Sequence, residues 1–216
     1  MANRNVIIGA AVAALVIIYG ASTATYVPEG QEGKLTGEVS FDPNQVVTEF
    51  WQKNSKSYFS EKATDLSKVI SESGGDFKSV AAKYGRYSMG DSGELSFVVK
   101  GQGTVTEVKD KLRSGYLVIK PDDVSDDYKV RIQIGPVYKG SAVRDTISLI
   151  NYKDYKNQIE WAQVSVALHE LVQKEVVTPV KPSELLNKKV SYIGCFTVGT
   201  SPKTLNITPV ELKVVE

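Results

Sequence analysis

The stretch YKVRIQIGPVYKGSAVRD, residues 128–145 of this 216-residue chain, contains the pattern of a β-strand followed by that of a helix start. Apolar and polar side chains alternate in its first half, which is the period of a half-buried β-strand. Gly135-Pro136 ends this strand, and Gly140-Ser141 opens a helix whose first turn carries Arg144 and Asp145. The stretch therefore predicts an α+β domain in which strands and helices share one core.

Further strand patterns on both sides of this stretch predict a small barrel or sandwich over residues 87–216. Apolar and polar residues alternate over 95–100, and Gly101-Gln102-Gly103 predicts a hairpin turn before a strand at 104–108. Short strands separated by turns are typical of such folds. The other predicted elements are strands at 116–119, 190–198 and 205–215 and helices at 140–150 and 155–175.

The segment before these strands predicts a compact helical subdomain, residues 42–86, inserted ahead of the barrel strands. Asp42 and Pro43 have the residue types of an N-cap and a first helical residue. A second helix is predicted over 61–73 and a third over 76–84, and glycines follow both.

An apolar N-terminal segment predicts that the protein leaves the cytoplasm. Arg4 is the only charged side chain before Glu29, and residues 6–24 are close to the about 20 residues that cross a bilayer. We expect a signal segment or an uncleaved anchor at 1–25, followed by a linker and first strand at 26–41. The expected location is the cell envelope, with the domain anchored to the cytoplasmic membrane and facing the periplasm or the outside.

The overall composition argues against several classes of function. The 26 basic and 25 acidic residues leave a net charge of +1, so there is no electrostatic footprint for nucleic acid. Cys195 is the only cysteine and His169 the only histidine, so no Cys/His metal spacing exists. We expect no metal and no cofactor, with Cys195 packed in the core and His169 at the boundary of a helix face.

Polar side chains of fixed geometry gather near the strand exit and at two helix starts. Helix N-termini favour anions and arginine offers a planar fork, so this cluster predicts a site for a small polar ligand or a partner. The alternative is an internal network, in which Arg144 pairs with Asp145 or Glu160. The candidate site residues are Gln133, Arg144, Asp145, Asn157, Gln158 and Glu160.

Four segments of the chain resemble an uncharacterised bacterial family. They are GKLTGEVSFDPNQVVTEFW (33–51), QIGPVYKGSAVRD (133–145), YKNQIEWA (155–162), and VSYIGCFTVGT (190–200) with the NITPVEL (206–212) that follows it. The family is that of the predicted periplasmic lipoproteins called domain of unknown function 2291. The resemblance implies an OB-like β-barrel with an inserted helical subdomain, an envelope location and a genomic neighbourhood of sugar ABC-transporter components. It implies no catalytic residues.

One departure from the family concerns the membrane anchor. Many relatives are called lipoproteins, whereas this chain has no cysteine next to its apolar segment that could carry a lipid. We therefore expect a plain anchor in the place of a lipid.

Taken as a whole, the sequence predicts a membrane-anchored accessory protein that is not an enzyme. Its barrel would bind a small polar ligand or a partner, in association with sugar ABC-type uptake. The alternative is a cell-envelope hydrolase acting on a sugar or cell-wall substrate, with Asp145 or Glu160 as its acid or base. Exposed, unpaired Arg144 and Asp145 in a cleft would favour a ligand or enzyme site, and a buried mutual pair would weaken both.

Overall fold

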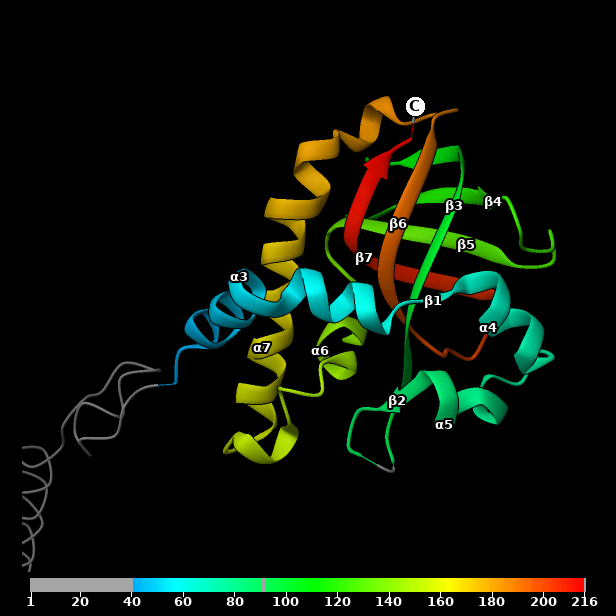
Figure 1. Cartoon of the computed structure of the whole chain (residues 1–216). Coiled ribbons are helices and arrows are strands. Elements are labelled where there is room, and N and C mark those ends of the chain that lie inside the picture. The colour runs from blue at the N-terminus through cyan, green and yellow to red at the C-terminus, as the bar shows by residue number, and fades with distance from the viewer. Residues whose placement is uncertain (1–40, 91, 216) are drawn as a thin grey trace, which may run out of the picture. The chain divides into compact units, whose positions relative to one another are not determined.

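A barrel of five strands forms the centre of the computed structural model, which describes residues 41–90 and 92–215 (Figure 1). The strands pair in the order β3-β4-β5-β7-β6, and β3 also pairs with β6, which closes the barrel. The β5–β7 pairing is parallel and the other four are antiparallel. This is the architecture of an OB fold. The strands are β3 (Leu95–Lys109), β4 (Ser114–Pro121), β5 (Lys129–Pro136), β6 (Lys189–Thr197) and β7 (Thr204–Val214).

The hairpin turn predicted at Gly101-Gln102-Gly103 is wrong, because β3 runs through it without a break. One part of β3 pairs with β6, with Gly101 opposite Tyr192, and its last part pairs with β4. At Gly103 an added Cβ would collide with the carbonyl oxygen of Lys120. These glycines therefore allow the close approach of neighbouring strands in a closed barrel.

Alternating side chains of the strands fill the barrel, as the sequence predicts. In β5, Val130 and Ile132 are fully buried, and β6 and β7 begin and end within one residue of their predicted limits. Cys195 is buried in this core, which confirms its expected role as a packed residue. Burial raises the pKa of its thiol to about 12, and Thr146 Oγ1 donates a hydrogen bond to Sγ at 3.2 Å.

The chain ahead of the barrel is helical, with two short strands. Asp42 accepts a hydrogen bond from the backbone N–H of Asn44 at 2.9 Å, which confirms the predicted N-cap. The second predicted helix starts later than expected, because Thr64 and Asp65 pair in parallel with β3. The elements are α3 (Pro43–Lys62), β1 (Thr64–Asp65), α4 (Leu66–Ser73), η1 (Phe77–Val80), α5 (Ala81–Tyr84) and β2 (Gly85–Tyr87).

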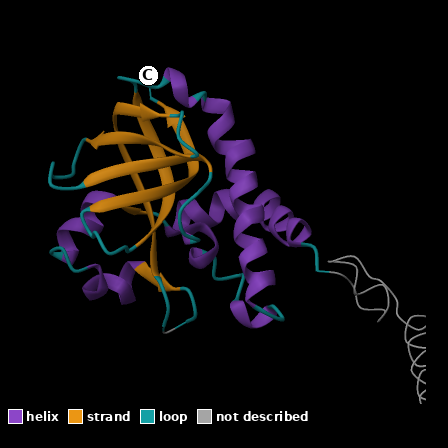
Figure 2. Ribbon diagram, turned by 180° about the vertical axis from the view of Figure 1, so that it is seen from behind, coloured by secondary structure: helices purple, strands orange, loops and turns teal. Residues whose placement is uncertain are grey.

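A second helical segment connects β5 to β6 and runs along the side of the barrel (Figure 2). The helix predicted at 140–150 shortens to α6, because Ile147 has an extended backbone. The helix predicted at 155–175 forms as α7, which continues as a π-helical turn, η3. The elements are α6 (Ala142–Thr146), η2 (Tyr152–Asp154), α7 (Gln158–Leu171), η3 (Val172–Val177), η4 (Thr178–Val180) and η5 (Pro182–Glu184).

The predicted signal or anchor segment at 1–25 lies outside the described residues, as does nearly all of the predicted linker and first strand at 26–41. Among the helices of the described part, none is long and apolar enough to cross a membrane.

Candidate functional site

Arg144 and Asp145 form a buried pair on α6. Arg144 Nε and Nη2 donate to Asp145 Oδ1 at 2.9 and 2.7 Å, and Nη1 donates to the carbonyl oxygen of Trp161 at 3.0 Å. The guanidinium also lies over the Trp161 ring, 4.2 Å from its centroid. Asp145 is fully buried, and burial raises the pKa of its carboxyl group against the opposing effect of Arg144. This pair has the geometry of the internal network.

Gln133 is also buried, on β5, and its amide holds the loop that follows the strand. Its Nε2 donates to Thr208 Oγ1 at 2.9 Å and to the carbonyl oxygen of Lys139 at 3.2 Å, and its Oε1 accepts from the N–H of Lys139 at 2.7 Å. The hydrogen-bonding capacity of this amide is therefore largely used within the protein. We call the buried pair of Arg144 and Asp145, with its hydrogen bond to the Trp161 carbonyl, the Arg144 network.

The three remaining candidate residues belong to the first turn of α7. Asn157 is the N-cap, and its Oδ1 accepts from the N–H groups of Ile159 and Glu160 at 2.9 Å each. Glu160 Oε2 accepts from the N–H of Lys156, the residue before the N-cap, at 2.9 Å. Gln158 is exposed. These side chains start a helix, and the structure does not bring them together with Gln133.

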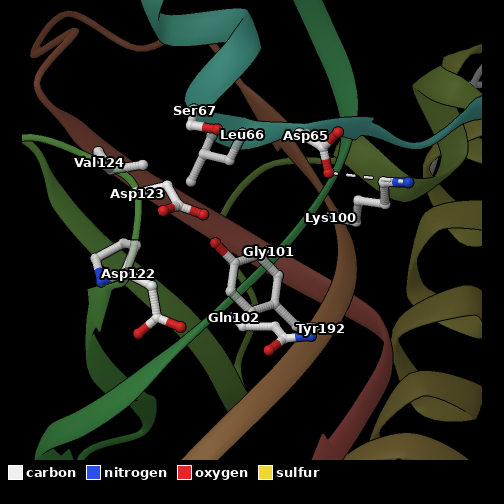
Figure 3. A pocket seen from close by; sticks show the side chains of 11 residues that line it. Asp65, Leu66, Ser67, Lys100, Gly101, Gln102, Asp122, Asp123, Val124 and Tyr192 are labelled. Carbon is white, nitrogen blue, oxygen red and sulfur yellow. Dashed lines mark ion pairs between the residues drawn. The ribbon is translucent and has the colours of Figure 1, made fainter.

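A polar cavity of about 300 Å³, here called the polar groove, lies beside the barrel where α4 begins (Figure 3). Asp65 faces Lys100 at 3.8 Å, and Asp122, just after β4, pairs with Lys189 at 2.7 Å. Asp123 is exposed and has no ion pair among the described residues. The side chains that give the groove its polar character are those of Asp65, Ser67, Lys100, Gln102, Asp122, Asp123 and Tyr192.

Tyr192 provides the least usual feature of the polar groove. Its side chain is 2% exposed, and its hydroxyl group has no hydrogen-bond partner within the described structure. In Figure 3 this hydroxyl points toward Asp123 and Leu66. The ring crosses the strand at Gly101, where an added Cβ would lie 2.6 Å from the hydroxyl oxygen. A buried hydroxyl without a partner costs about 1–3 kcal/mol, and this one belongs to a residue that lines the polar groove.

Another cavity, of about 740 Å³, lies against α7 and is here called the apolar cleft. Tyr138 stacks on His169 with 4.9 Å between ring centroids, and its hydroxyl donates to Gln173 Oε1 at 2.9 Å. His169 is half-buried, at the boundary position that the sequence predicts. Burial, and secondarily the charge of Arg144, lower the pKa of His169 to about 4. The apolar residues of its lining include Pro136, Val137 and Val166.

Two further aspartates, Asp126 and Asp127, lie in the turn between β4 and β5 and face lysines. Asp126 lies 3.4 Å from Lys120, and Asp127 lies 3.8 Å from Lys203. Within residues 41–90 and 92–215, no group of three or more His, Cys, Asp or Glu side chains could hold a metal ion.

Comparison with known families identifies the chain's relatives. A family described as "Predicted periplasmic lipoprotein (DUF2291)" matches residues 12–213. The chain belongs to this family. The resemblance seen in the sequence is therefore confirmed, and the family's description supports a location in the cell envelope. No curated protein matches the sequence.

The fold is similar to that of an OB-fold protein from Thermotoga maritima, known from a crystal structure. The two chains are 17% identical with a TM-score of 0.64, and the similarity covers 82% of this family member and 100% of the other chain. At this identity the likeness shows the fold alone. The expected OB-like barrel is thus confirmed.

The stretch 133–145, where the sequence predicted the candidate site, does not line the polar groove. Residues 133–145 supply Pro136, Val137 and Tyr138 to the apolar cleft, whereas Gln133 and Arg144 face inward. The polar groove was missed, because Gly101 was interpreted as a turn residue. A glycine inside a strand pattern also signals close backbone or side-chain approach, and that signal could have found it.

Proposed function

We propose that this protein is a non-enzymatic binding module of the cell envelope whose polar groove takes a saccharide. The single observation that carries the proposal is the buried hydroxyl of Tyr192, which has no hydrogen-bond partner in the described part of the chain and adjoins an open polar cavity. The proposal includes anchoring to the cytoplasmic membrane through residues 1–25. It also includes an association with sugar ABC-type uptake, which only the sequence resemblance supports.

The charges of the polar groove favour a neutral, hydroxyl-rich ligand. Lys100 faces Asp65 and Lys189 pairs with Asp122, so each of these carboxylates already has a counter-charge. Carboxylate oxygens still accept hydrogen bonds from sugar hydroxyl groups, and the amide of Gln102 can both donate and accept. OB folds bind oligosaccharides, although usually on the face of their second and third strands, here β4 and β5.

The positions of the acid/base candidates favour binding over hydrolysis. Asp145 is fully buried, and Glu160 accepts a hydrogen bond from the N–H of Lys156 in the first turn of α7. Neither side chain lines the polar groove. A general acid or base has to come within hydrogen-bond reach of its substrate, so the hydrolase alternative has less support than a binding module.

A thermal-shift and calorimetric screen with neutral hexoses, pentoses and sugar acids tests the proposal. A sugar at 100 times its Kd would stabilise the protein by about 2.7 kcal/mol. In Tyr192→Phe, loss of one hydrogen bond would weaken binding roughly two- to tenfold. Tyr138→Phe is the matched control, because Tyr138 lies in the apolar cleft and its loss should leave sugar binding unchanged. The proposal fails if no saccharide binds, or if Tyr192→Phe binds as tightly as the wild type.

A further inference from the structure

We infer that the binding surface is built for a linear, neutral oligosaccharide and extends well beyond the polar groove. This inference rests on the proposed function, that the groove takes a saccharide. It adds the size and the charge class of the ligand.

The polar groove continues directly into a second cavity on the outer face of β3 and β6. This cavity has a volume of about 310 Å³ and shares Asp65, Lys100, Gln102 and Tyr192 with the groove. In the β3–β6 pairing, Gln102 lies opposite Ser191. The second cavity therefore adds the hydroxyl group of Ser191, next to Gln102, to the lining.

A third cavity, of about 420 Å³, continues the track from β6 and β7 to α3. It shares Ile193 and Glu211 with the second cavity. Neighbouring strands lie about 4.8 Å apart, so crossing β3, β6 and β7 alone spans roughly 10 Å. We call the three connected cavities the long track. Its length suits a chain of several sugar units.

The far end of the long track has the polar and aromatic character of the groove end. Trp51 Nε1 donates to Glu175 Oε2 at 2.8 Å, which fixes the indole at the wall of the third cavity. Gln52 and Lys56 are exposed on the α3 side of this cavity. Each of these two side chains can hydrogen-bond to a ligand without first breaking a contact within the described protein.

Charge along the long track selects against acidic saccharides. Three of its five carboxylates pair with lysines, in Asp65–Lys100, Asp122–Lys189 and Glu211–Lys213, which leaves two carboxylates against Lys56. Like charges brought together across an interface are strongly unfavourable. A neutral chain can donate its hydroxyl groups to the carboxylates, whereas a uronic acid chain adds repulsion. The carboxylates are Asp65, Asp122, Asp123, Glu175 and Glu211.

The inference is tested by calorimetry with cello-, malto- and manno-oligosaccharides of one to six units. For at least one series, affinity should rise tenfold or more between one and four units and then level off. Oligogalacturonates of equal length should bind more weakly than the neutral chains. Tri- to hexalysine peptides serve as a second probe, because an acidic track could also hold a basic peptide.

Two lysine variants of α3 test whether the third cavity belongs to the track. Lys56→Ala should reduce the gain in affinity with chain length and leave single-sugar binding unchanged. Lys53→Ala is the matched control, because Lys53 lies on the same helix, pairs with Glu49 and does not line the track. It should bind every length as the wild type does.

The possible failures are distinguishable. If single sugars bind as tightly as chains, or if Lys56→Ala keeps the full gain with length, the inference is overturned and the proposed function stands. If oligolysine binds and no saccharide does, both are overturned in favour of a peptide site. If no saccharide of any length binds, the proposed function and the inference fall together.

Discussion

The Arg144 network and the polar groove are both rich in polar side chains, but they direct their hydrogen-bonding groups differently. In the network, Arg144 donates to Asp145 and to the backbone at Trp161, and the pair is sealed from solvent. In the groove, the hydroxyl of Tyr192 has no partner among the described residues, and the charged groups border an open cavity. Asp145 Oδ2 also has no hydrogen-bond partner within the described structure, so the two regions differ chiefly in that the groove borders an open cavity and the buried pair does not.

The largest expected effect comes from breaking the Arg144 network. Arg144→Ala removes one partner of a buried ion pair and should lower the free energy of unfolding by about 3–5 kcal/mol. Urea unfolding measures this change. Arg113→Ala, at an exposed arginine between β3 and β4, is the control and should change stability by less than about 0.5 kcal/mol. An unchanged melting temperature combined with lost ligand binding would instead make Arg144 part of a ligand site.

Most of the barrel could be predicted from the sequence because its signals are local. Alternation of apolar and polar residues predicts β5, and the side chain and position of Asp42 predict the start of α3. The continuity of β3 could not be predicted in the same way. It depends on pairing with β6, a strand far along the chain, and Gly101 and Gly103 look locally like a turn.

The candidate site was harder to predict, because the residue types alone do not determine which polar side chains are buried. Arg144 and Asp145 would suit a ligand site if they were exposed, and only the packing of α6 against the barrel turns them inward. The polar groove depends on the register that places Gly101 opposite Tyr192. Neither residue indicates a site by its type, and the groove depends on the pairing of the two strands that carry them.

The next effect concerns His169, which lies between the apolar cleft and the Arg144 network. Its pKa in the folded protein is about 4, below the ordinary value of 6.5, because of burial and then the charge of Arg144. The unfolded chain therefore binds more protons, so stability is lost as pH falls from about 6.5 to about 4. The loss should approach roughly 3 kcal/mol.

Urea unfolding at pH 7, 5.5 and 4 measures this loss. Carboxylates also titrate toward pH 4, so the comparison that isolates the histidine is with His169→Gln, which should show a smaller fall in stability over the same range. Identical pH profiles for wild type and variant would mean that His169 is equally easy to protonate in both states. The apolar cleft would then be wetter than its packing indicates.

The smallest expected effect comes from filling the space above Gly101, at the floor of the polar groove. A Cβ there would lie 2.6 Å from the hydroxyl of Tyr192, so Gly101→Ala forces the buried ring to shift and should destabilise the protein by roughly 1–3 kcal/mol. Gly199→Ala is the matched control, because an added Cβ there meets nothing within 4 Å. Adding Tyr192→Phe to Gly101→Ala should restore part of the lost stability, since the nearest colliding atom is removed. If the two changes are simply additive in thermal melts, the hydroxyl does not press on Gly101, and the groove floor is looser than the close packing of this pair indicates.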